Sequence, residues 1–176
     1  SPIVNTIIDA DGNGRAFNIT AGPVTFTNLN IINGDAEDGG GIFVAGADLS
    51  LEGCAITDNI ASGSSGSGGG IFVDAGATLT ATDTDISGNQ ANRAGGGIED
   101  NSGAGLAITL DNVTLDNNNA GVAPATASPG NGGGLHITGA GDAMIIGGTV
   151  NDNVAAAEGG GLWNGSGMMT IDASEI

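Results

Sequence analysis

The segment from Asp9 to Gly14 places acidic and amide side chains at alternate positions. It reads Asp-Ala-Asp-Gly-Asn-Gly, and alternating oxygen side chains around a glycine turn form the first half of a calcium-binding loop. The twelfth position of such a loop is Thr20, where a bidentate glutamate is expected. Asp, Asn and Gly are also the ordinary residues of tight turns. Two interpretations follow, a Ca²⁺ site with the ligands Asp9, Asp11 and Asn13, or a turn without a metal.

A second set of side chains follows a Gly-Gly-Gly triplet that recurs along the chain. Two residues after the successive triplets stand Phe43, Phe72, Glu99, His136 and Trp163. Alternation along a strand would turn this column outward, with the rings of adjacent coils about 5 Å apart. An exposed row of aromatic side chains suits sugars or a partner surface, which makes Phe43, Phe72, His136 and Trp163 the candidate ligand-binding residues. The alternative is that the rings stack to stabilise the ladder, or that a neighbouring loop covers them.

Catalytic chemistry would need groups that this sequence supplies sparingly. A general base needs an orienting partner, and the sequence shows none for His136. Lyases of acidic polysaccharides need a base and cations, but the chain has no Lys, and Arg15 and Arg93 are expected in different corners. Glycosidases need paired carboxylates in a cleft, whereas acids such as Asp83 and Asp85 are expected on a solvated surface. We therefore predict no catalytic residue and no enzyme activity.

The charge balance limits the partners of the chain. It carries 20 acidic and two basic residues, for a formal net charge of -18 at pH 7. Nucleic acid and anionic membranes require clustered cations, so neither is an expected partner. No apolar run approaches the length of a membrane-spanning helix, which argues against direct membrane insertion. The single cysteine, Cys54, falls on a column predicted to face inward, where a small buried thiol is expected.

Two short motifs repeat along the chain in fixed phase. The triplets end at Gly41, Gly70, Gly97, Gly134 and Gly161, in steps of 29, 27, 37 and 27 residues. Between them lies the motif aliphatic-x-x-Asn-x-Ala, whose amides are Asn59, Asn89, Asn118 and Asn153. A fixed period in this range is typical of a solenoid. The amides are predicted to form a buried ladder at a bend, and the insertions at 62–67 and 121–131 to lie at one corner.

Within each repeat, apolar and polar residues alternate, as in Leu49-Ser50-Leu51 and Ile108-Thr109-Leu110. A period of two indicates strands, and the glycine density excludes helix. Stacked repeats would lay each strand beside its equivalent, which gives three parallel sheets around a narrow core. The predicted fold is all-β, a right-handed parallel β-helix of about six coils, open at one or both ends; the hand follows the usual rule for parallel crossovers.

We expect residues 1–176 to form a single solenoid domain that is part of a longer chain. Residues 1–38 form an atypical first coil, and the repeats are 39–67, 68–94, 95–131 and 132–158, followed by an incomplete last coil at 159–176. Both ends stop inside a repeat, so unpaired strand edges are expected there. They would be covered either by further chain or by head-to-tail stacking of copies into a filament.

The repeated Gly-Gly-Gly-Ile and Ile-x-x-Asn-x-Ala motifs resemble the right-handed parallel β-helix repeats of large bacterial surface and secreted proteins. They are similar to the Gly-Gly-Ala-Ile and Phe-x-x-Asn motifs of the chlamydial polymorphic outer membrane proteins, with aliphatic residues in place of Phe. The architecture also resembles pectate-lyase-like solenoids, and the segment Ile7–Phe17 resembles the opening coil of the group. The resemblance implies an adhesive or structural protein and supplies no catalytic signature.

These observations together predict a non-catalytic, extracellular structural or adhesive module at the cell surface. It would act as a stalk, a filament subunit or an adhesin. Its expected partners are copies of itself, other surface proteins or glycans, and Ca²⁺ is the one candidate cofactor. The alternative is a polysaccharide-binding segment, or a polysaccharide-degrading lyase or glycosidase, built on the same fold.

Overall fold

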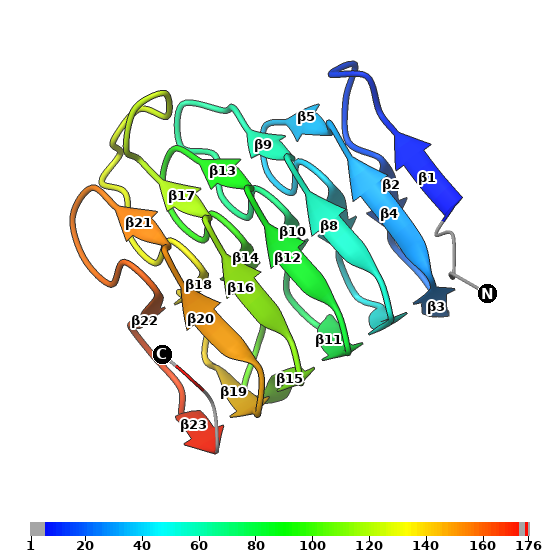
Figure 1. The fold of residues 1–176 in the computed structure, drawn as a ribbon. Helices are drawn as coiled ribbons and strands as arrows, with labels where there is room; N and C mark the ends of the chain where they lie inside the picture. Colours follow the sequence, from blue (N-terminus) through cyan, green and yellow to red (C-terminus); the bar gives the residue numbers. More distant parts are fainter. Residues whose placement is uncertain (1–5, 173–174, 176) are drawn as a thin grey trace.

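The computed structural model describes residues 6–172 and Glu175. Strands of successive repeats pair in parallel and stack into a β-solenoid of about five turns, close to the six coils predicted (Figure 1). These residues contain no helix, and so no helix that is long and apolar enough to cross a membrane. The prediction of an all-β parallel solenoid is confirmed.

Three of the sheets have six strands each. Sheet A consists of β1 (Thr6–Asp9), β4 (Leu29–Ile32), β8 (Ala55–Thr57), β12 (Asp85–Ser87), β16 (Thr114–Asp116) and β20 (Thr149–Asn151). Sheet B consists of β2 (Phe17–Ile19), β6 (Ile42–Val44), β10 (Ile71–Val73), β14 (Ile98–Asp100), β18 (Leu135–Ile137) and β22 (Leu162–Asn164). Sheet C consists of β3 (Pro23–Thr27), β7 (Asp48–Glu52), β11 (Thr78–Thr82), β15 (Gly105–Asp111), β19 (Gly141–Ile146) and β23 (Met169–Asp172).

A fourth sheet, which we did not predict, is formed by the two residues that follow the asparagine in each Asn motif and by their equivalents in β5. Sheet D consists of β5 (Asp35–Ala36), β9 (Ile60–Ala61), β13 (Gln90–Ala91), β17 (Asn119–Ala120) and β21 (Val154–Ala155). Strands of two residues are too short to show a period of two. The predicted count of three sheets is thus one too few. The insertions at 62–67 and 121–131 both fall between sheets D and B, at a single corner as expected.

Equivalent residues of successive coils lie directly above one another. In sheet B, Ile42 pairs with Ile71 and Ile71 with Ile98, and in sheet A Ile56 pairs with Ile86. All five of these isoleucines are fully buried. Cys54 is also buried, with Sγ 3.4 Å from the carbonyl oxygen of Phe26, as expected for a small inward-facing thiol. The core is therefore a set of aliphatic columns along the axis of the solenoid.

The Gly-Gly-Gly triplet brings the chain from sheet D into sheet B. Its first residue needs a left-handed backbone, as at Gly68 with φ +65°, a conformation that glycine adopts without steric cost. At the second residue, Gly69, a Cβ atom would come closer than 3.0 Å to the carbonyl oxygens of Gln90 and Gly96. The triplet is thus required both by the turn and by the close approach of two neighbouring backbones.

The predicted amide ladder is present at the bend between sheets A and D. The side-chain oxygen of each asparagine accepts a hydrogen bond from the backbone N–H of the residue at the same position in the preceding coil, from Gly34→Asn59 to Asn118→Asn153. Each side-chain amide also donates to a backbone carbonyl, as Asn118 Nδ2 does to the oxygen of Ile86 at 2.8 Å. The ladder satisfies backbone groups that a tight bend would otherwise leave unpaired.

Candidate functional site

The outward face of sheet B is a single column of side chains. Each strand of this sheet has three residues, and in its inner strands the first and third point into the core, so one side chain per coil faces out. The backbone register places these side chains in the order Asn18, Phe43, Phe72, Glu99, His136 and Trp163. We call this set the sheet B column. It brings together all four residues predicted to bind a ligand.

The aromatic members of the column stack on one another in pairs. The rings of Phe43 and Phe72 are 5.2 Å apart with an interplanar angle of 3°, close to the spacing predicted from the strands. The rings of His136 and Trp163 are 4.3 Å apart at 9°. The guanidinium of Arg15 lies 4.8 Å from the centre of the Phe43 ring, within range of a cation–π interaction.

The middle of the column is buried, which differs from the exposed row that alternation suggested. Phe72 is 7% exposed and His136 is 3% exposed. Neighbouring rings cover the ring faces, and the glycine triplet passes close to the base of the His136 side chain, since a Cβ at Gly132 would lie 2.6 Å from Cβ of His136. Phe43 and Trp163, which are half-buried, retain accessible surface. Sequence alternation gives the direction of a side chain but not what packs over it.

Glu99 supplies the orienting partner that the sequence did not reveal for His136. Its carboxylate is fully buried, and Oε2 lies 2.9 Å from Nδ1 of His136. A carboxylate acceptor favours a hydrogen on Nδ1, and in the neutral imidazole Nε2 is then the nitrogen without a hydrogen. Nε2 has no hydrogen bond to any residue that the structure describes. The sequence could have indicated this pair, because Glu99 occupies the same column as His136, one coil earlier.

Two further side chains complete the polar part of the column. Thr138 Oγ1 donates to Glu99 Oε1 at 2.5 Å and lies 3.0 Å from Nδ1 of His136. Arg93 Nη2 lies 2.9 Å from Glu99 Oε1, and Arg93 Nε donates to Ser67 Oγ at 2.7 Å. The buried carboxylate therefore has three partners, as a buried charge requires. Sequence analysis missed Arg93 and Thr138, whose side chains reach the column from the adjoining segments.

The two arginines do not lie in different corners, so that expectation was wrong. Arg15 and Arg93 both lie in the segment just before a strand of sheet B, β2 for Arg15 and β14 for Arg93. Each contacts a member of the sheet B column, Phe43 for Arg15 and Glu99 for Arg93. All the cationic side chains of the chain are thus gathered along one face.

We expect Glu99 to control the tautomer of His136. Replacing Glu99 by leucine should leave the Thr138 hydroxyl, which can donate or accept, as the partner of Nδ1, so both tautomers become populated. The substitution should cost about 3 kcal/mol because Arg93 loses its buried partner. The ¹⁵N chemical shifts of His136 report the tautomer directly. Glu99→Gln is the matched control, since its amide oxygen can still accept from Nδ1. An unchanged tautomer in Glu99→Leu would contradict the assigned role.

The predicted calcium loop lies beside an open hollow at the first coils. Asp9 Oδ1 accepts hydrogen bonds from the backbone N–H of Asp11 at 2.9 Å and from Asn33 Nδ2 at 3.0 Å. The bond from Asn33 in particular holds the pKa of Asp9 below its usual value. Asn13 Nδ2 donates to the carbonyl oxygen of Asp11. Asp9 and Asn13 therefore form turn hydrogen bonds in this structure.

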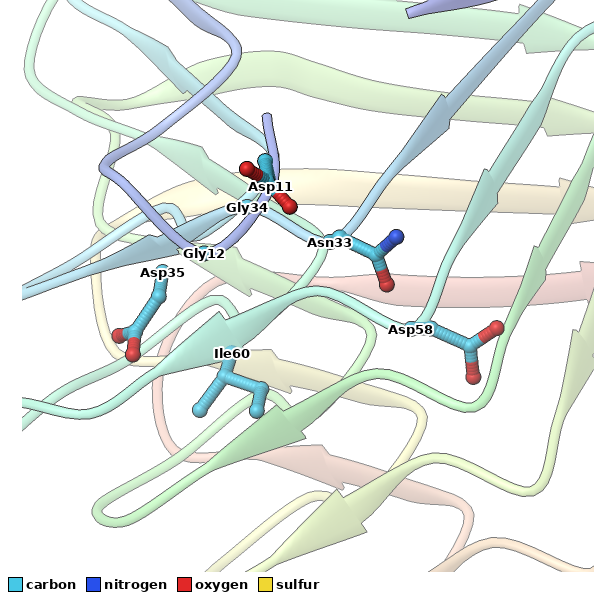
Figure 2. A pocket seen from close by; sticks show the side chains of 7 residues that line it. All are labelled: Asp11, Gly12, Asn33, Gly34, Asp35, Asp58 and Ile60. Atoms are coloured by element: carbon cyan, nitrogen blue, oxygen red, sulfur yellow. The ribbon is translucent and has the colours of Figure 1, made fainter. Parts of the chain in front are cut away.

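The hollow itself has a volume of about 250 Å³ and is lined by Asp11, Gly12, Asn33, Gly34, Asp35, Asp58 and Ile60. Figure 2 shows that the carboxylates of Asp11, Asp35 and Asp58 come from three successive coils and point in different directions. Among residues 6–172 and 175, no group of three or more His, Cys, Asp or Glu side chains is placed to share a metal. Calcium binding by Asp9, Asp11 and Asn13 stays a prediction.

Neither the protein-family models, nor the curated proteins, nor the solved structures contain a match to this chain. The function proposed below therefore rests on the parallel solenoid and its sheet B column.

Proposed function

We propose that the chain is a non-catalytic structural or adhesive module of an extracellular or cell-surface protein. The observation that carries the proposal is the bonding within the sheet B column. Glu99 is held by Arg93, His136 and Thr138, and the rings of the column stack on each other. Such a column stiffens the stack of coils, because the ring contacts and the contacts of Glu99 with His136 and Thr138 join residues of different coils.

The exterior supports the same proposal. The net charge of -18 keeps a long solenoid soluble through self-repulsion and disfavours nucleic acid and anionic membrane surfaces. A rigid acidic rod is suited to act as a stalk, a filament subunit or an adhesin. Glycans or other surface proteins are the partners that we propose for its faces, with the accessible edges of Phe43 and Trp163 as the first residues to test.

One experiment separates this proposal from an enzymatic one. The purified chain is incubated with neutral and uronate-containing polysaccharides, and product formation is followed together with binding on a glycan array. We expect no turnover, with or without glycan binding. Release of unsaturated or reducing sugar ends by the chain would refute the non-catalytic proposal.

A polysaccharide-degrading or polysaccharide-binding segment is the second candidate, and one arrangement favours it. His136 has a buried carboxylate on Nδ1 and an unbonded Nε2, which is how a general base is oriented. Both arginines lie along the same face, where they could neutralise uronate groups. If turnover is found, this candidate requires that His136→Asn abolish it.

The face of the last coil around Gly160 is the surface where we propose that a further coil stacks. In the inner coils, a Cβ on the middle glycine of the triplet would collide with the backbone of the next coil, as at Gly69. At Gly160, the same position in the last triplet, a Cβ would meet only the carbonyl oxygen of Asn153, at 3.1 Å. Gly160 is exposed, and Val154 and Ile171 of this coil are each 42% exposed. We propose that a further coil stacks here, either from continuing chain or from a second copy, and the second-copy case is the one that a test of assembly addresses.

A valine at position 160 should separate assembly from folding. We expect the wild-type chain to form end-to-end oligomers at high concentration, seen by sedimentation velocity and electron microscopy. Gly160→Val should melt at the same temperature but remain monomeric, because the new side chain occupies the space of the next coil. Thr170→Val, on the outward side of β23, is the matched control and should assemble normally. A wild-type chain that stays monomeric would rule out stacking of copies.

A further inference from the structure

An acidic residue occupies an aliphatic column of the core. Asp100 ends β14, and its register partners in the neighbouring coils are Val73 and Ile137. Both partners are fully buried, and so is Asp100. An ionised carboxylate in such a place costs several kcal/mol unless it is paired. The carboxyl group of Asp100 therefore destabilises the core of this coil when it is ionised.

The hydrogen bonds of Asp100 leave half of the carboxyl group unpaired. Oδ1 accepts from the backbone N–H of Ser102 at 2.9 Å. Oδ2 is buried and has no hydrogen-bond partner. Burial raises the pKa of Asp100 above its usual value, hydrogen bonds from Ser102 offset part of this, and the nearby Glu99 and Asp142 raise it further. A neutral carboxyl group is the form that this environment favours.

The surrounding chain is shaped to enclose this carboxyl group. A Cβ at Gly141 would lie 2.9 Å from Asp100 Oδ2 and closer still to Ser102 Oγ. A Cβ at Gly139 would overlap the backbone of Ser102. The register of β15 against β19 also shifts between Leu106 and Ile108, so that Ala107 packs beside Gly141. We call residues 100–107 with residues 138–141 the Asp100 corner, which joins sheets B and C.

The surface of the Asp100 corner leaves room for it to open. A hollow of about 230 Å³ lies there and is lined by Ser102, Gly103, Ala104, Gly105, Leu106 and Ala107 together with Gly76, Ala77 and Thr78 of the previous coil. Leu106 is 52% exposed. The segment that covers Asp100 contacts Gly139 and Gly141 and is joined by backbone hydrogen bonds to residues 138–140 on one side, and Asn101 bonds to Val73 and Asp74 on the other.

We propose that Asp100 makes this corner a pH-sensitive latch, which is closed when the carboxyl group is neutral and opens locally to water when the group ionises. Ionisation in the closed corner would bury an unpaired charge, whereas opening hydrates it. The inference does not depend on the proposed function, since it concerns the stability of one corner. In an extracellular module it would couple exposure of segment 101–107 to the pH of the surroundings.

The charged groups around Asp100 either disfavour its ionisation or lie on the opposite face of sheet B. Val73 of β10, Ile137 of β18 and Ala107 of β15 contribute no charge on the core side. Glu99 precedes Asp100 in β14, and Asp142 lies at the start of β19; both carboxylates disfavour a second negative charge. Arg93 and His136 are on the opposite face of sheet B, where they are bonded to Glu99. No cation in the described residues is therefore placed to pair with ionised Asp100.

The sign of the pH dependence follows from the raised pKa. The closed corner binds the proton more tightly than the open corner, whose carboxyl group has its ordinary pKa of 3.8. Stability of the closed form is fully present below that value and is lost as the pH rises through the pKa of the closed form. Between the ordinary pKa and the pKa of the closed form, the population of the open corner should rise by up to about tenfold per pH unit.

Hydrogen exchange of the full chain, followed by mass spectrometry from about pH 4.5 to about pH 8, tests the latch. After correction for the intrinsic exchange rate, peptides covering 101–107 and 138–142 should lose protection as the pH rises in the wild type. Asp100→Asn should remove this dependence, and Asp100→Val, which restores the residue of the previous coil, should remove it and protect the corner more strongly. Asp85→Asn, an exposed acid on sheet A, is the matched control and should behave as wild type.

Two results would overturn the latch. One is wild-type protection of the corner that does not change with pH, and the other is a pH dependence that persists in Asp100→Val. If Asp100→Asn does not fold, the wild type and Asp100→Val still decide the question. None of these outcomes bears on polysaccharide turnover or on assembly, so the latch and the proposed function fail or stand separately.

Discussion

Replacing Gly69 by alanine is expected to lower the free energy of unfolding by at least about 4 kcal/mol. The added Cβ would come closer than 3.0 Å to the carbonyl oxygens of Gln90 and Gly96. Both oxygens belong to backbone that is fixed by ladder hydrogen bonds, so neither can move without separating the coils. The substitution should therefore wedge sheet D away from the glycine triplet and loosen two coils at once.

Gly160→Ala is the matched control, because Gly160 holds the same place in the last triplet. Its added Cβ would meet only the carbonyl oxygen of Asn153, at 3.1 Å. We expect a cost within about 1 kcal/mol at this exposed site. Urea titrations of both variants, followed by circular dichroism at concentrations where the chain is monomeric, give the comparison. Equal costs for the two substitutions would show that the triplet is required by local backbone conformation and not by packing between coils.

Asn118→Ala is expected to cost about 3–5 kcal/mol, the second large effect. The side chain of Asn118 accepts hydrogen bonds from Asn89 N and Nδ2, and donates to Ile86 O and Asn153 Oδ1, with all four distances between 2.8 and 3.1 Å. Asn118 is fully buried. Truncation would leave several buried polar groups of three coils without partners, and each unpaired group costs about 1–3 kcal/mol.

Two variants sharpen this second prediction. Asn118→Asp keeps the size of the side chain but replaces the donor by an acceptor facing Ile86 O and Asn153 Oδ1, so its cost should grow as the pH rises and the new carboxyl ionises. Asn151→Ala, at an exposed position on β20, is the control and should change stability by less than about 0.5 kcal/mol. Thermal and urea unfolding measure both. A cost for Asn118→Ala as small as that for Asn151→Ala would mean that the ladder does not hold the bend.

The inward columns could be predicted from the sequence because they depend on two regularities only, the repeat of the motifs along the chain and the alternation of side chains along a strand. Motifs that recur in fixed phase place Ile42 above Ile71, and a period of two along the strand places both side chains in the core. The amide ladder follows from the same register, since Asn59, Asn89 and Asn118 keep a fixed distance from the aliphatic anchor. Sheet D was missed because two residues cannot display a period.

The candidate site was predicted only in part. Alternation identified the sheet B column and its ring spacing, but it could not show that Phe72 and His136 are buried. Contacts from the adjoining segments, such as those of Arg93 and Thr138 with Glu99, depend on the path of corner loops that carry no repeat. Asp100 went unnoticed for the opposite reason, since it breaks a column that the repeat predicts to be aliphatic.

The sequence by itself determined the stacked parallel coils, the aliphatic core and the asparagine ladder, because each depends on residues that recur at one place in a regular turn. Only the tertiary structure decided which outward side chains are covered, which partner orients His136, that both arginines lie on one face, and how Asp100 is enclosed. These features arise from contacts between a coil and its irregular corners, and such contacts are set by the three-dimensional path of the chain.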